Sequence, residues 1–176
     1  MIRFQGVKED VVKTDRVLVP LDGSSLAERA LTVAIEVLSD RPGATLILMR
    51  AAETTTAPGT GPTDAPVSAG GEAQSYLKAL ADRLRDQGFS RAVMTSVWSS
   101  APVHAIAEAA RTRRANVIVM SARLRSGLGR GILSPVPDSV MRSTRTPILI
   151  VPAGYGQLDV QRLRMAVGEM DRVRVA

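Results

Sequence analysis

The chain has no cysteine and a single histidine, His104, and these two scarcities exclude several kinds of site. Without cysteine there is no disulfide, no thiolate zinc site and no cysteine nucleophile. One histidine is too few for a multi-histidine metal centre. Aromatic residues make up only 3% of the 176 residues, so the core has to be aliphatic. A stacking platform for single-stranded nucleic acid is therefore not expected.

Long hydrophobic segments are also missing. No uncharged apolar run approaches the roughly 18 residues of a membrane-spanning helix, and residues 1–12 lack the apolar stretch of a signal peptide. We therefore expect a soluble cytoplasmic protein without a membrane partner. Hydrophobic residues still make up 45% of the chain, which is enough to build the core of one compact domain.

The positive charge is high but scattered. The formal net charge is +6, and of the 23 basic residues only Lys8, Lys13 and Lys78 are lysines. The arginines are spread along the whole chain, as expected for solvated helix faces. The group Arg111, Arg113 and Arg114, for example, is predicted to be a solvated helix end. Nucleic acid is therefore not an expected partner, and such binding would weaken steeply with salt.

Five short segments have the pattern of β-strands. Residues 17–20, 46–49, 117–120 and 148–151 are continuous apolar runs, which are typical of strands buried on both faces of a parallel sheet. Residues 92–98 alternate between two faces, which suits an edge strand. Helical patterns lie between these runs. The order predicts an α/β fold, a three-layer sandwich with helices on both faces of a five-stranded parallel sheet and right-handed crossovers.

The helices have recognisable starts. Ser25 and Glu28 have the spacing of a capping box at the start of the first helix. The third helix opens near Pro102, and a short fourth helix follows Ser134 with two valines expected to face inward, Val136 and Val140.

Composition also suggests where the domain ends. Residues 54–71 are rich in Pro, Gly, Thr and Ala without periodicity, which predicts a mobile loop before the second helix. Residues 1–15 and 153–176 are interpreted as extensions of a domain that spans residues 16–152.

Four segments together resemble a universal stress protein domain over roughly residues 15–152. They are VLVPLDGSSLAERALTVA, ATLILMRAAE, PVHAIAEAA and ANVIVMSARLRSGLGRGILSPVPDSVMRSTRTPILIVP. The resemblance implies a sheet order of 3-2-1-4-5 and a ligand crevice where strands one and four end. It also implies a homodimer that pairs around the last strand, whose exposed edge needs a cover; residues 153–176 are a candidate for that cover.

The resemblance assigns a candidate site to the crevice. In family members that bind ATP, the residue matching Asp22 contacts the nucleoside end, and backbone groups near Ala51 help to hold the base. The candidate residues for a nucleotide or a small anion are Pro20, Asp22, Ala51, Met120, Ser121, Arg123, Gly127, Arg130 and Ser134.

The family's phosphate signature is altered in this chain. ATP-binding members carry Gly-x2-Gly-x9-Gly-Ser/Thr after strand four, and the four matching positions here are Ser121, Leu124, Ser134 and Pro135. Proline has no N–H, so Pro135 and Pro137 remove two donors from a helix start that would otherwise bind an anion. We therefore expect the family's mode of ATP binding to be lost. The loop SARLRSGLGRG offers an alternative, since its arginines can grip a phosphate.

Other chemistry is weakly supported. The chain has no Gly-x-Ser-x-Gly elbow for a hydrolase, and His104 is expected to point toward solvent. Asp22 also has a structural interpretation, because a carboxylate before a helix favours its dipole and bonds turn amides.

Two functions remain open from the sequence. The first is a non-catalytic stress-response or regulatory protein that acts through homodimerisation and contact with a protein partner, with no cofactor. The alternative is a switch that binds an adenine nucleotide, ATP or AMP, and is at most a slow ATPase.

Overall fold

The computed structural model describes residues 15–52, 65–125, 132–133 and 135–153. The elements, in chain order, are β1 (Arg16–Pro20), α1 (Ser25–Leu38), β2 (Thr45–Ala51), α2 (Ala65–Asp86), β3 (Ala92–Trp98), α3 (Pro102–Thr112), β4 (Val117–Ala122), β5 (Leu124–Arg125), β6 (Ile132–Leu133), α4 (Pro135–Ser143) and β7 (Ile148–Pro152). No helix within these ranges has both the length and the hydropathy needed to cross a membrane.

The main sheet has five parallel strands in the order β3-β2-β1-β4-β7. This is the predicted 3-2-1-4-5 order, and β3 lies at an edge as its alternating sequence indicated. The apolar runs form the centre: Val17, Leu18 and Val19 of β1 are fully buried. Consecutive residues of a strand point to opposite faces of the sheet, so the burial of all three shows that helices cover both faces.

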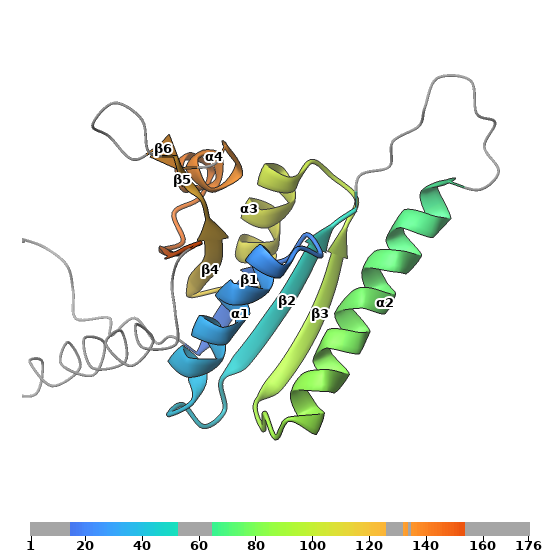
Figure 1. Ribbon diagram of the computed structural model, residues 1–176, viewed down its shortest axis with the longest axis vertical. Coiled ribbons are helices and arrows are strands. Elements are labelled where there is room, and N and C mark those ends of the chain that lie inside the picture. Colours follow the sequence, from blue (N-terminus) through green and yellow to red (C-terminus); the bar gives the residue numbers. More distant parts are fainter. Residues whose placement is uncertain (1–14, 53–64, 126–131, 134, 154–176) are drawn as a thin grey trace, which may run out of the picture.

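Two aliphatic clusters fill the spaces on either side of the sheet. Leu46 and Leu48 of β2 pack with residues of α1 and α2 on one face, whereas Ile47 and Met49 pack with residues of α3 and α4 on the other. Figure 1 shows this layered arrangement, with α1 and α2 on the near side of the sheet and α3 behind it. The predicted three-layer sandwich is confirmed.

The start of α1 differs from the predicted capping box. Ser24, not Ser25, is the N-cap, and its hydroxyl accepts a hydrogen bond from the amide of Ala27 at 3.2 Å. Glu28 is therefore one residue too far along for a capping box. Its carboxylate instead binds side chains of α2, so the residue joins two helices.

Helix α2 begins earlier than predicted. Residues 65–71 are helical, so only residues 54–64 of the predicted loop remain as a possible loop, and these lie outside the described residues. Pro66 is tolerated in the first turn, where no intrahelical N–H bond is lost. The two glycines at 70 and 71 lower the helix propensity, which explains why the sequence pattern placed the helix start too late.

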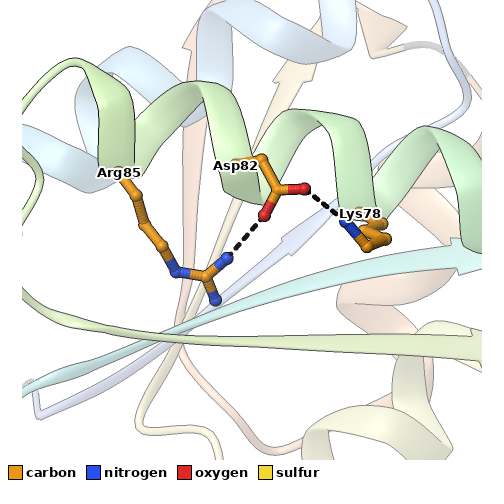
Figure 2. A network of polar contacts seen from close by, with 3 residues as sticks. All are labelled: Lys78, Asp82 and Arg85. Carbon is orange, nitrogen blue, oxygen red and sulfur yellow. Dashed lines mark hydrogen bonds and ion pairs between the residues drawn. The ribbon is translucent and has the colours of Figure 1, made fainter.

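The outer face of α2 carries a small polar network (Figure 2). Asp82 accepts hydrogen bonds from Lys78 at 2.6 Å and from Arg85 at 2.8 Å. The hydrogen bond from Lys78 is the main cause that lowers the pKa of Asp82. All three side chains are at least two-fifths exposed, so the network is a solvated helix face.

The end of α3 departs from the predicted solvated arginine group. Arg111 pairs with Glu108 on the surface, but Arg113 is half-buried over β3. Its Nη2 atom donates to the hydroxyl of Ser96 at 3.3 Å, and the indole N–H of Trp98 donates to the same hydroxyl at 2.8 Å. Arg113 is therefore attached to β3 through Ser96 instead of lying in solvent.

The segment after β4 adds one feature that the sequence did not indicate. Residues 124–125 and 132–133 pair as a two-stranded antiparallel sheet, which precedes α4. In α4 itself, Val140 is fully buried as predicted, but Val136 is 36% exposed and Pro137 takes the buried position. The prediction for Val136 was wrong because the start of the helix is turned toward the crevice.

Candidate functional site

A crevice of about 520 Å³ opens above the carboxyl ends of the central strands. Ligand pockets of open α/β sheets lie at such a topological switch point, and this volume is within the usual range for a small organic ligand. The lining residues come from β1, β2, β4 and the starts of three helices: Pro20, Leu21, Asp22, Ser24, Leu26, Ala27, Met49, Arg50, Ala51, Pro102, Ile106, Met120, Ser121, Arg123, Pro135, Val136 and Pro137.

Six of the nine predicted site residues lie in this crevice. Pro20 and Asp22 come from the end of β1, Ala51 from the end of β2, and Met120 and Ser121 from β4, with Arg123 just beyond it. The other three predicted residues, Gly127, Arg130 and Ser134, lie outside the described residues. His104 is exposed on α3 as predicted and is not among the lining residues.

Asp22 has a structural role that leaves part of its carboxylate available. Its Oδ1 atom accepts a hydrogen bond from the amide of Ser24 at 2.8 Å, which closes the turn between β1 and α1. The side chain is exposed. A carboxylate has room for several more hydrogen bonds, so the second oxygen can accept one from a ligand hydroxyl.

Ser121 supplies an unused polar group on the neighbouring strand. Its hydroxyl oxygen is buried, and it has no hydrogen-bond partner among the described residues. A buried hydroxyl without a partner is unfavourable by about 1–3 kcal/mol. Because that oxygen has less than 1 Å² of accessible surface, a ligand atom in the crevice reaches it only if neighbouring side chains move.

Arg50 is a lining residue that the sequence reasoning missed. Its guanidinium lies over the ring of Tyr76, with 5.1 Å between the guanidinium carbon and the ring centroid. Gly23 lies against the same group: a Cβ there would be 3.5 Å from Arg50 Nη1. Arg50 is the penultimate residue of β2, but nothing in the sequence alone showed that its side chain lines the crevice.

Tyr76 is itself fixed by a network between α1 and α2. Its hydroxyl donates to Glu28 Oε1 at 3.0 Å, and Arg83 Nη2 donates to the other oxygen of Glu28 at 2.7 Å. Burial, followed by the hydrogen bond to Glu28, raises the pKa of Tyr76 to about 12. The phenol therefore stays protonated at neutral pH and keeps its ring beside Arg50.

The wall formed by the start of α4 is apolar. Pro135, Val136 and Pro137 line it, together with Ile106 of α3. Neither proline has an amide hydrogen to offer. No group of three or more His, Cys, Asp or Glu residues that could hold a metal ion occurs within the described ranges. Among the described lining residues, the crevice therefore combines one apolar wall with the carboxylate of Asp22, two serines and two arginines.

Solved structures with the same architecture include nucleotide complexes. A universal stress protein family member from Burkholderia pseudomallei is 26% identical, with a TM-score of 0.61 over 79% of this chain and 96% of that one. A universal stress protein in complex with cAMP is 26% identical, with a TM-score of 0.58 over 78% and 96%. An Arabidopsis thaliana protein with AMP bound shares the fold at 14% identity, with a TM-score of 0.54 over 78% and 90%.

Sequence comparison with families of proteins agrees with the fold. No curated protein sequence is significantly similar to the chain. The model of the universal stress protein family, in contrast, matches residues 13–152, which include every described element of the sheet and every described lining residue of the crevice. The chain belongs to the universal stress protein family.

Proposed function

We propose that this protein is a non-catalytic regulator of the stress response whose crevice binds a nucleoside monophosphate. The observation that carries the proposal is the crevice itself, in which Asp22, Ala51 and Ser121 meet around about 520 Å³ of space. The second oxygen of Asp22, whose side chain is exposed, suits the polar edge of a nucleoside. Similar folds have been solved with AMP and with cAMP bound.

A monophosphate fits this crevice better than a triphosphate. A polyphosphate chain requires several N–H donors or cations along its length. At the start of α4, two of the first three residues are prolines, and the wall they form is apolar. Binding of ATP in the family's usual mode is therefore not expected.

The ionisable groups of the crevice support binding more than catalysis. The described lining residues that carry charge are Asp22, Arg50 and Arg123. Asp22 already accepts a hydrogen bond from the Ser24 amide, and none of the described lining residues is a histidine or lysine that could share a proton with it. We expect at most slow hydrolysis of a bound nucleotide.

The role of Asp22 can be tested with two variants. Asp22→Ala removes both the turn hydrogen bond and any contact with the ligand, whereas Asp22→Asn keeps an oxygen for the Ser24 amide and loses the charge. We expect AMP to bind the wild type in titration calorimetry, and both variants to weaken binding about ten- to a hundredfold, because hydrogen bonds to charged groups are worth about 1.5–3 kcal/mol.

Two outcomes would contradict this proposal. If millimolar AMP and cAMP give no heat with the wild type, the crevice does not bind nucleotide. If Asp22→Asn binds like the wild type and only Asp22→Ala is weak, Asp22 acts on the turn and not on the ligand.

The last strand supports a homodimer as the working form. Among the described residues β7 pairs only with β4, so no described strand covers its other edge, and Ile148, Leu149 and Ile150 are only partly buried. An open hydrophobic edge of this kind requires a cover. We expect sedimentation velocity at micromolar concentration to show a dimer. A monomer at every concentration up to about a hundredfold higher would contradict this expectation.

A further inference from the structure

Strand β3 forms one edge of the main sheet, and among the described residues it pairs only with β2. This pairing runs through seven consecutive residues without a bulge, from Ala92 to Trp98. The segment AVMTSVW contains no charged residue, no proline and no glycine, and only Ser96 in it is buried. A long, regular and uncharged edge of this kind is a template for the addition of another strand.

Two arginines from other elements lie against one face of this strand. Arg113, at the end of α3, donates from Nη2 to the hydroxyl of Ser96 at 3.3 Å. Arg16, at the start of β1, donates from Nη2 to the sulfur of Met94 at 3.6 Å and from Nε to the carbonyl of Arg113 at 2.8 Å. Met94 and Ser96 are two residues apart in β3, so they share a face. The two guanidinium groups therefore contact neighbouring positions on the same face of the edge strand.

These two charges have no carboxylate partner within the described part of the chain. None of the salt bridges between described residues involves Arg16 or Arg113. A guanidinium has five N–H donors, and the hydrogen bonds above occupy only some of them. The Nε atom of Arg113 is buried, so the terminal nitrogens are the ones available to a partner. Both side chains are partly exposed.

The charge selects the kind of strand that can be added. Two copies of the chain paired through β3 would bring four guanidinium groups over one pair of strands, and like charges on facing strands are destabilising. A strand with carboxylates at alternate positions is complementary instead. Its acidic side chains lie on one face about 7 Å apart, which is the spacing of Met94 and Ser96 along β3.

We propose that the open edge of β3 is a docking site for an extended acidic segment of a partner protein. The segment adds to the sheet as a further strand, its backbone forms hydrogen bonds with β3, and its carboxylates bind Arg16 and Arg113. Neither arginine lines the crevice, and β7 lies at the opposite edge of the sheet. The site is therefore independent of nucleotide binding and of a dimer that pairs through β7.

The test uses the full chain and three synthetic peptides of seven residues with blocked ends. The first alternates glutamate with threonine, and the second alternates lysine with threonine. The third is the glutamate peptide with a methyl group on every backbone nitrogen, which keeps the charge but leaves no N–H to donate across the edge. In titration calorimetry we expect the wild type to bind the first peptide at least about tenfold more tightly than either of the others.

Trp98 reports whether the peptide binds at β3. It is the only tryptophan of the chain, and its indole N–H donates to the hydroxyl of Ser96 that also binds Arg113. Binding of the glutamate peptide should change the emission of Trp98 with the same half-saturation as the heat. Heat without any change in this emission would place the peptide elsewhere and contradict the proposal.

Three arginine variants test the contribution of charge. Arg16→Ala and Arg113→Ala should each weaken the glutamate peptide about three- to tenfold, because each removes one charge-assisted contact at a partly exposed site. Arg114→Ala is the matched control, since Arg114 is exposed and follows Arg113 directly; it should change the affinity less than about twofold. If an alanine variant does not fold, the comparison of the three peptides on the wild type still decides.

Several outcomes would overturn the proposal. The first is a wild type that binds no peptide, or that binds the glutamate and lysine peptides equally. Equal binding of the methylated peptide would show an anion site without strand pairing, and an equal loss in Arg114→Ala would show a general effect of charge. If the wild type binds no peptide and Arg16→Ala self-associates in sedimentation velocity, the arginines only prevent pairing of β3 between copies of the chain.

Discussion

Replacing Leu18 with alanine is expected to lower the free energy of unfolding by about 2–5 kcal/mol. Leu18 is fully buried in β1, the strand at the centre of the sheet, and it belongs to the cluster that α3 and α4 cover. Its backbone is paired with Ile47 on one side and Ile118 on the other. Because hydrogen-bonded strands flank the position, the cavity left by the substitution cannot collapse, and the full cost of the lost packing remains.

Urea unfolding followed by circular dichroism measures this effect. Met141→Ala is the control, since Met141 is a large apolar side chain that is 50% exposed on α4, and its loss should change stability by less than about 0.5 kcal/mol. The slope of the unfolding curve should be the same for both variants. A loss below about 1 kcal/mol for Leu18→Ala would mean that the core around β1 is less tightly packed than the structure indicates.

Filling the crevice should abolish ligand binding. Ala51 lies at the end of β2 and lines the crevice, so Ala51→Trp places an indole in the space that a nucleoside would occupy. We expect the affinity for both AMP and adenosine to fall by at least about a hundredfold. The fold should be preserved, because large aromatic residues are favourable in strands.

Ala92→Trp is the matched control for this substitution. Ala92 is exposed at the start of β3, at the end of the sheet away from the crevice, and the variant should bind as the wild type does. Wild-type affinity in Ala51→Trp would show that the nucleotide binds elsewhere. This test does not depend on the orientation of the ligand, so it examines the location of the site alone.

The amino-acid sequence by itself determined the five strands of the main sheet and the four helices, but not the small sheet of β5 and β6. Continuous apolar runs identified the strands, because a strand buried on both faces has no polar position along its length. Asp22 and Ser121 were placed at the crevice because the resemblance to the universal stress protein family implies that strands one and four are neighbours in the sheet. The loss of amide donors at Pro135 and Pro137 needed no structure, since it is a property of the covalent chain.

Local patterns were less reliable where two interpretations compete within one turn. The capping serine was displaced by one residue from Ser25 to Ser24, and Val136 proved to be 36% exposed. Either of two adjacent serines can cap a helix, and either the valine or the proline next to it can face the core. Which serine caps α1, and which residue of α4 is buried, depended on how these two helices pack on the sheet.

Only the tertiary structure decided the contacts between distant residues. Arg50 could not be recognised as a site residue until Tyr76, from the next helix, was found beneath its guanidinium, and Glu28 was assigned to a cap until its partners on α2 were seen. Arg113 was expected in solvent and instead donates a hydrogen bond to Ser96 of β3. The physical reason is the separation of these residues along the sequence. Helix propensity and hydrophobic periodicity report on residues within one helical turn or a few strand positions. These side chains, in contrast, are positioned by elements that meet only when the chain folds.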